Sequence, residues 1–218
     1  ADGVSAVRTA REFRPDAVGI SALTAESFLA HKLAAAVKAA EPGMPVVLVL
    51  GGSLGAGTVN NSVGGGIGLI ETSGVQMIWQ TGSHYYDRMR EMAEAQGVTR
   101  IRVTGFINRM DLAYAAADME FAGAGTISEL ALVAKPVILV PSPNVAEDHQ
   151  THNAMALVNR GAAMLVRDAD AQDELVKTAI DLVNDTAKRS SLSENIRKMA
   201  IRDADEVIAG EVLKMVKR

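Results

Sequence analysis

The sequence predicts an α/β fold, a three-layer α/β/α sandwich built on a doubly wound, mainly parallel sheet of six to seven strands. Three observations support this prediction. Short aliphatic runs alternate with longer stretches of helical periodicity along the chain. The aliphatic runs show little apolar–polar alternation, as expected of strands that are covered on both faces. Glycine-rich turns follow several of these runs, at the strand ends where such sheets bind ligands.

The predicted elements alternate in the order expected of a Rossmann-like or flavodoxin-like sheet with right-handed crossovers. No linker or internal repeat interrupts them, so residues 1–218 are predicted to form a single domain. The predicted strands are Ala17–Ser21, Val46–Leu50, Val75–Gln80, Ile101–Val103, Met119–Ala122, Val137–Val140 and Ala163–Val166. The predicted helices are Val4–Phe13, Glu26–Ala40, Thr58–Ile70, His84–Gln96, Arg109–Ala116, Thr126–Val133, Gln150–Arg160, Gln172–Asn184, Lys188–Ala200 and Asp205–Val216.

The composition excludes several classes of function. The net charge is −4 and no basic stretch stands out, which argues against a nucleic-acid groove or an anionic membrane surface as the main partner. Cysteine is absent, so disulfides, thiolate metal sites and a cysteine nucleophile are excluded, and a reducing, cytoplasmic location is predicted. No apolar run approaches the roughly 18 residues of a membrane span, and no signal peptide is visible.

The first candidate site is the loop Gly51–Ala56, which follows the Val46–Leu50 strand and precedes a helix. Backbone N–H groups at the start of a helix attract phosphate, and glycines let the anion approach closely. The spacing matches neither G-x-G-x-x-G nor a Walker A loop. Phosphate binding and a simple glycine turn therefore both remain open from this stretch alone.

A second glycine loop, Gly123–Gly125, leads into the predicted helix that contains Glu129. The Glu129 carboxylate is a candidate acceptor for the hydroxyl groups of a ribose. The alternative is a capping box, in which Thr126 and Glu129 satisfy the free amides of their own helix.

Polar side chains also crowd the segment Pro141–Asn153 after the Val137–Val140 strand. Gln150 and Asn153 are candidates for recognition of sugar hydroxyls. His149 and His152 share a helix face, but a zinc site is disfavoured because nothing fixes a third ligand. A polar helix cap is the alternative interpretation.

The fourth candidate follows the Ile101–Val103 strand, where Phe106, Ile107 and Met110 stand in a loop. Exposed apolar residues at this position could contact a flat base. The alternative is a helix entry with Asn108 as N-cap and with Ile107 or Met110 in the core.

In this order, the four loops resemble the C-terminal, nucleotide-sugar-binding half of the MurG family. These bacterial transferases add N-acetylglucosamine to the lipid-linked peptidoglycan precursor. The resemblance covers residues 46–218 and is carried by VLVLGGSLGAGTVNNSV, VQMIWQTG, VTGFINRMDLAYAAADM, GAGTISELALVAKPVILVPSPNVAEDHQTHNAMALVNRGAAMLV and LSENIRKMAIRDADEVIAGEVLKM.

The resemblance implies a site for UDP-N-acetylglucosamine or UDP, with no metal and no cofactor. The diphosphate would meet the first glycine loop and Thr126, the uracil the backbone of Ile107, the ribose Glu129, and the sugar Gln150. The full set of implied contact residues is Gly52, Ser53, Gly55, Phe106, Ile107, Met110, Gly123, Ala124, Thr126, Glu129, Gln150 and Asn153.

Three departures from the family pattern favour binding without catalytic turnover. Gly57 and Phe121 stand where the family usually has arginine. The acceptor domain that resembling enzymes carry N-terminally is absent from this sequence, and none of the four histidines matches a family catalytic position. An active hexosyltransferase that uses a lipid-linked acceptor is the alternative.

Residues 1–45 resemble the second half of a cobalamin-binding, flavodoxin-like domain. The resemblance is carried by Ser21–Leu23 after one strand and Gly51–Gly52 after the next. The family's cobalt-ligating histidine is missing, since no histidine precedes His31, so a fold fragment is implied rather than a cobalamin-binding module. Together the two resemblances predict an engineered chimera joined at the Val46–Leu50 strand, with a natural truncated sequence as the alternative.

Two further features raise open questions. The run Gly64–Gly66 and Gly68 lie inside a predicted helix, where each glycine costs about 1 kcal/mol relative to alanine. They either permit close helix packing or weaken the helix. The last predicted helix carries an apolar set that must pack on the N-terminal fragment or mediate self-association: Val207, Ile208, Val212 and Leu213.

Overall fold

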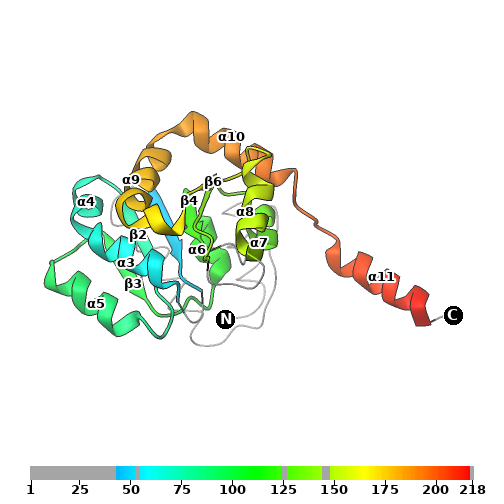
Figure 1. Cartoon of the computed structure of the whole chain (residues 1–218), viewed down its shortest axis with the longest axis horizontal. Coiled ribbons are helices and arrows are strands. Elements are labelled where there is room, and N and C mark those ends of the chain that lie inside the picture. The colour runs from blue at the N-terminus through cyan, green and yellow to red at the C-terminus, as the bar shows by residue number, and fades with distance from the viewer. Residues whose placement is uncertain (1–42, 53–54, 124–126, 144–147, 217–218) are drawn as a thin grey trace.

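The computed structural model describes residues 43–52, 55–123, 127–143 and 148–216. Over these residues it forms a six-stranded sheet in the order β3-β2-β1-β4-β5-β6, and every neighbouring pair is parallel (Figure 1). The predicted doubly wound α/β fold is therefore confirmed. The strands are β1 (Val46–Leu50), β2 (Gln76–Gln80), β3 (Ile101–Thr104), β4 (Met119–Ala122), β5 (Val137–Leu139) and β6 (Met164–Leu165).

Helices cover both faces of the sheet and bury two apolar layers. One layer joins the sheet to α6, α7 and α8, and the other joins it to α3, α4, α5 and α9. The helices are α3 (Gly57–Gly65), α4 (Ile67–Thr72), α5 (Tyr86–Ala95), α6 (Met110–Ala116), α7 (Ile127–Val133), α8 (His149–Val158), α9 (Ala171–Asn184), α10 (Thr186–Arg197) and α11 (Ala204–Val216), with a short 3-10 helix, η2 (Asp168–Asp170).

The central strand β1 shows why the aliphatic runs carry no polar alternation. Successive side chains of a strand point to opposite faces. Val46 and Leu48 enter the α6–α8 layer, whereas Val47 and Val49 enter the α3–α9 layer. Because both layers are apolar and exclude water, every residue of the strand is buried and apolar.

The helix predicted over Thr58–Ile70 is two helices, because Gly66 ends α3 and precedes α4. A β-carbon placed on Gly66 would lie 2.6 Å from Cγ2 of Val176 in α9, and one placed on Gly65 would lie 2.5 Å from Nε2 of Gln172. Glycine is thus required at position 66, whereas the flexible side chain of Gln172 can move away from a β-carbon at position 65. Both alternatives raised by the sequence apply here, since these glycines permit close packing and also interrupt the helix.

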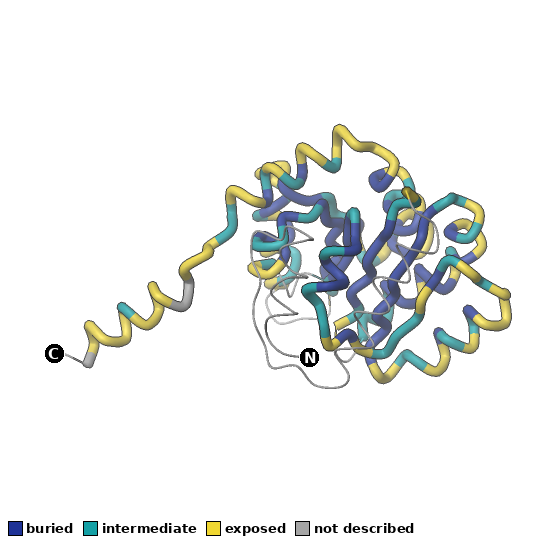
Figure 2. The backbone as a smooth tube through the Cα atoms, turned by 180° about the vertical axis from the view of Figure 1, so that it is seen from behind, coloured by how far each residue is buried: buried dark blue, intermediate teal, exposed yellow. Residues whose placement is uncertain are grey.

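Helix α11 extends away from the sheet, at the right of Figure 1, and most of its described residues are coloured as exposed in Figure 2. The apolar residues singled out on this helix are exposed, with exposed fractions of 53% for Val207, 64% for Ile208, 52% for Val212 and 60% for Leu213. Among the helices that the structure describes, none combines the length and the apolarity needed to cross a membrane.

The elements predicted upstream of Gly43 lie outside the described residues. These are the strand Ala17–Ser21 and the helices Val4–Phe13 and Glu26–Ala40. The predicted packing of α11 on this N-terminal fragment therefore stays a prediction.

Candidate functional site

The candidate site lies at the carboxyl edge of the sheet, where parallel strands end together. The chain runs outward from β1 to β3 and then returns to β4, so the order reverses between β1 and β4. Such a switch point is where open α/β sheets bind ligands. The loops after β1, β3, β4 and β5 all leave from this edge. These are the four loops that the sequence predicts at the strand ends where such a sheet binds ligands.

The loop after β1 brings the backbone close to β2. The N–H of Gly51 donates to the carbonyl of Gln80 at 2.9 Å, and a β-carbon on Gly51 would lie 2.7 Å from that oxygen. Gly52 and Gly55 have φ angles of 73° and 96°, a conformation that favours glycine. Ser53 lies outside the described residues.

This loop leads into the amino end of α3, where the N-cap residue has no side chain that could cap the helix. Ala56 occupies the N-cap position, and the first bond within the helix runs from the N–H of Asn60 to its carbonyl at 2.9 Å. The amides of the first turn, beginning at Gly57, therefore face the edge of the sheet. Such N–H groups, together with the helix dipole, favour a bound anion.

A buried polar pair fixes α3 against β2 beneath this loop. The amide nitrogen of Asn60 donates to the carbonyl of Thr81 at 2.8 Å, and its oxygen accepts from the indole N–H of Trp79 at 2.8 Å. Asn60 and Trp79 are both fully buried. The hydrogen bond between Asn60 and Trp79 was not predicted from the sequence, although the single tryptophan of the chain was an available signal.

The loop after β3 presents one apolar side chain and buries the next. Phe106 is 57% exposed and Ile107 is 3% exposed. Only the backbone of Ile107 is therefore available to a ligand, and its contact with the uracil stays a prediction. The suggestion of Asn108 as N-cap is wrong, because α6 begins at Met110 with Arg109 in the capping position.

Glu129 lies exposed in the first turn of α7, directly after the β4 loop. Gly123 is described, whereas Ala124 and Thr126 lie outside the described residues, so the capping-box alternative stays open. Tyr114 of α6 is buried, and burial together with the nearby carboxylates of Glu120 and Glu129 raises the pKa of its hydroxyl.

An unexpected acidic residue lies within the sheet beneath Glu129. Glu120 of β4 is fully buried, and neither of its carboxylate oxygens has a hydrogen-bond partner among the described residues. Burial raises the pKa of this carboxyl well above its ordinary value, and Lys135 only partly opposes the shift. The buried carboxyl of Glu120 was not predicted from the sequence, although a glutamate inside the apolar run Met119–Ala122 was a visible anomaly.

The loop after β5 uses Gln150 as a support. Its Oε1 accepts a hydrogen bond from the backbone N–H of Ser142 at 2.9 Å, while Asn153 is exposed on α8. His149 and His152 also lie on α8. Among the residues that the structure describes, no group of three or more His, Cys, Asp or Glu side chains is placed to hold a metal ion. Those residues therefore offer no third ligand for the disfavoured zinc site.

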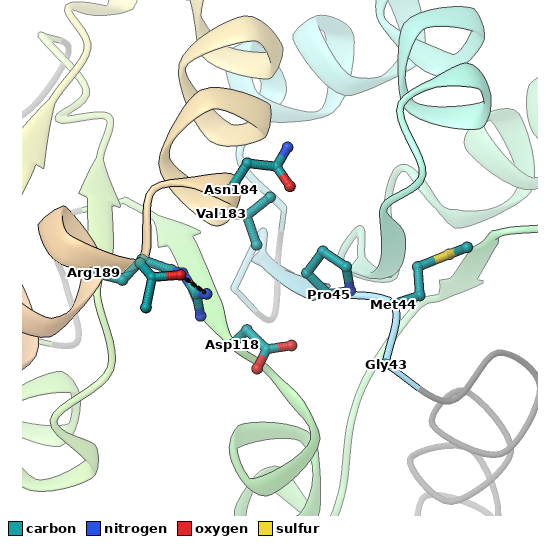
Figure 3. A pocket seen from close by; sticks show the side chains of 8 residues that line it. Gly43, Met44, Pro45, Asp118, Val183, Asn184 and Arg189 are labelled. Carbon is teal, nitrogen blue, oxygen red and sulfur yellow. Dashed lines mark hydrogen bonds between the residues drawn. The ribbon is translucent and has the colours of Figure 1, made fainter.

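A cavity of about 370 Å³ lies at the opposite, amino edge of the sheet (Figure 3). Asp118 borders it and also accepts a hydrogen bond from the N–H of Val46 at 2.8 Å, which holds the start of β1. None of the predicted site residues lines this cavity. Its lining is Gly43, Met44, Pro45, Asp118, Val183, Asn184, Thr186 and Arg189.

Comparison with known families matches residues 46–208 to the glycosyltransferase family 28 C-terminal domain. The chain belongs to this family. The match confirms the family predicted for the C-terminal part. Neither this match nor the relatives below support the cobalamin resemblance of residues 1–45 or an engineered join.

Curated relatives carry the name UDP-N-acetylglucosamine–N-acetylmuramyl-(pentapeptide) pyrophosphoryl-undecaprenol N-acetylglucosamine transferase. The protein from Bacteroides fragilis is 51% identical over 181 residues, which cover 81% of this chain and 48% of the relative. The protein from Porphyromonas gingivalis is 52% identical over 174 residues, which cover 79% of this chain and 46% of the relative. The chain thus spans about half the length of the curated relatives it matches.

Solved structures show the same fold. The crystal structure of Acinetobacter baumannii MurG matches with a TM-score of 0.70 at 22% identity, covering 91% of this chain and 57% of that one. Anabaena HepE in complex with UDP-glucose matches with a TM-score of 0.58 at 17% identity, covering 88% of this chain and 54% of that one. At these identities the likeness extends to the fold alone.

Proposed function

We propose that residues 46–218 form a nucleotide-sugar-binding domain that takes UDP-N-acetylglucosamine, or UDP, at the carboxyl edge of the sheet. The observation that carries this proposal is the amino end of α3, whose N-cap residue Ala56 has no capping side chain and which lies at the switch point of a chain that belongs to glycosyltransferase family 28. The relatives that are about half identical to the chain are named for their use of UDP-N-acetylglucosamine.

Each part of the ligand has a partner in the proposed complex. The amino end of α3 and the glycine loop receive the diphosphate, because N–H donors there need an acceptor. The exposed Glu129 accepts hydrogen bonds from the ribose hydroxyls. The uracil meets the backbone of Ile107, and Gln150 faces the sugar. The remaining proposed contacts are Gly52, Ser53, Gly55, Phe106, Met110, Gly123, Ala124, Thr126 and Asn153.

We further propose that this chain binds the donor without transferring its sugar. Transfer needs a general base beside the acceptor hydroxyl and a site that excludes water. His84, in the loop after β2, and His149, at the start of α8, are both exposed, so neither lies in a site that excludes water. An active hexosyltransferase remains the alternative, and transfer of N-acetylglucosamine from the donor to a lipid-linked acceptor, with release of UDP, would establish it.

The test is a calorimetric titration of UDP-N-acetylglucosamine and UDP into the protein and its Glu129→Ala variant. We expect a Kd of about 1 mM or below for the unaltered chain. Removal of a charged hydrogen-bond acceptor should weaken binding by about 10- to 100-fold. Glu91→Ala, which changes an exposed glutamate in the middle of α5, serves as the control and should bind as the unaltered chain does. No binding by the folded protein would refute the proposal.

A further inference from the structure

The side chain of Tyr85 lies directly against the glycine loop after β1. A β-carbon placed on Gly55 would lie 2.4 Å from Cδ2 of Tyr85, and one placed on Gly57 would lie 2.8 Å from its hydroxyl oxygen. Both distances are shorter than real β-carbons tolerate. The ring of Tyr85 therefore fits over the loop because both positions are glycine.

The hydroxyl of Tyr85 consequently lies beside the first turn of α3. Gly57 is the first residue of that helix, and its N-cap residue, Ala56, has no side chain that could cap the turn. The backbone of Tyr85 is itself fixed, since its N–H donates to the carbonyl of Gly82 at 3.3 Å and its carbonyl accepts from Met89 at 3.0 Å. A phenol donor on a fixed backbone thus joins the N–H donors of the helix end.

Arg88 adds positive charge to the same place. Its guanidinium carbon lies 5.7 Å from the centre of the Tyr85 ring, within the range of a cation–π contact. Its Nη2 also donates to the side chain of Asn61 on α3. Arg88 therefore links α5 to α3 across the ring and holds the ring in place. The sequence carries no cation at position 57, the first residue of α3.

We propose that Tyr85 is a specificity-determining residue that recognises the diphosphate. Its hydroxyl donates a hydrogen bond to a non-bridging phosphate oxygen at the amino end of α3, and Arg88 steadies the ring and contributes charge. The ligand class that this arrangement favours is a nucleoside diphosphate over the corresponding nucleoside. The inference rests on the proposed function, because it assigns a contact within the same site.

The alternative is that Tyr85 is only a packing residue that fills space over the glycine loop. In that case its ring would matter and its hydroxyl would not. Tyr85→Phe separates the two, because it keeps the ring and removes the donor. Tyr86→Phe is the matched control, since Tyr86 is the next residue and its ring lies 5.9 Å from the guanidinium carbon of a different cation, Arg90.

The experiment titrates UDP and uridine into the full chain and three variants, Tyr85→Phe, Tyr86→Phe and Gly57→Ala, with binding followed by ligand-observed NMR. For Tyr85→Phe we expect the affinity for UDP to fall about 10-fold, as for a lost hydrogen bond to a charged group, while the affinity for uridine stays unchanged. Tyr86→Phe should match the unaltered chain with both ligands. Gly57→Ala adds a β-carbon that displaces the hydroxyl but keeps the tyrosine. It should weaken the binding of UDP and leave the binding of uridine unchanged.

Two results would overturn the inference while leaving the proposed function intact. One is UDP binding that is equal in Tyr85→Phe and the unaltered chain. The other is an equal loss of UDP and uridine binding, which indicates a purely structural role. If the folded, unaltered chain binds no UDP, the proposed function itself fails and this inference fails with it.

Discussion

Glu120 places an acidic group where its strand neighbours are aliphatic. It pairs in the sheet with Leu48 of β1 and Val137 of β5. The titratable groups that act on it are Glu129 of α7, Lys135 after that helix and Tyr114 of α6. Because burial disfavours the charged form, the pKa is raised and the carboxyl holds its proton above the ordinary range.

A raised pKa makes the stability depend on pH with a defined sign. The folded state binds this proton more tightly than the unfolded state does. The stabilising contribution is therefore complete below the ordinary pKa of 4.5 and is lost as the pH rises through the folded pKa. We expect Glu120→Leu to remove this decline and to increase the free energy of unfolding at neutral pH by about 1–3 kcal/mol. Urea unfolding at a series of pH values measures both effects.

The matched control is Glu91→Leu, which changes an exposed glutamate of α5. It should leave the pH dependence of the unaltered chain intact. If Glu120→Leu and the unaltered chain lost stability equally as the pH rises, the burial of an unpaired carboxyl would be disproved.

At the scale of the elements, the junction of α3 and α4 packs closely on α9 because Gly66 has no side chain. Gly66 ends α3, and its N–H donates to the carbonyls of Ser62 and Val63 at 3.0 Å. A β-carbon there would lie within 3.0 Å of three atoms of Val176, which is fixed in α9. Gly68, two residues further on, has no atom within 4 Å of such a β-carbon.

The two glycines therefore predict opposite responses to alanine. Gly66→Ala should destabilise the protein by about 1–3 kcal/mol, because overpacking forces α3 and α9 apart. Gly68→Ala should be neutral or stabilise by up to about 1 kcal/mol, since alanine is the better helix former and the space is open. Thermal unfolding of the two variants measures the difference. A Gly66→Ala variant as stable as Gly68→Ala would contradict the close approach of the two helices.

The sequence predicted the elements well where local pattern decides them. β1 and β4 begin and end at the predicted residues, because each is an aliphatic or largely apolar run bounded by turn residues. The break at Gly66 could not be predicted in the same way. Its cause is Val176, which is distant in the sequence and reaches α3 only through the packing of α9.

At the scale of the whole molecule, the carboxyl edge could be predicted because parallel strands end together. The further residues that we propose for the site, and those that support it, could not. Tyr85 and Arg88 follow β2, whose loop carried no motif, and the pair Asn60–Trp79 is joined only in three dimensions. Self-association through α11 remains a prediction, since its apolar face is exposed over the described residues.

The central claim is that the ligand binds at the carboxyl edge of the sheet and not in the cavity at the amino edge. Titration of UDP-N-acetylglucosamine into isotope-labelled protein, followed through backbone amide resonances, tests this claim most directly. We expect large shifts for Gly52, Gly57, Ile107 and Glu129 and none for Asp118, which borders the cavity of Figure 3. Shifts confined to the residues around Asp118, or none at saturating ligand, would contradict the claim.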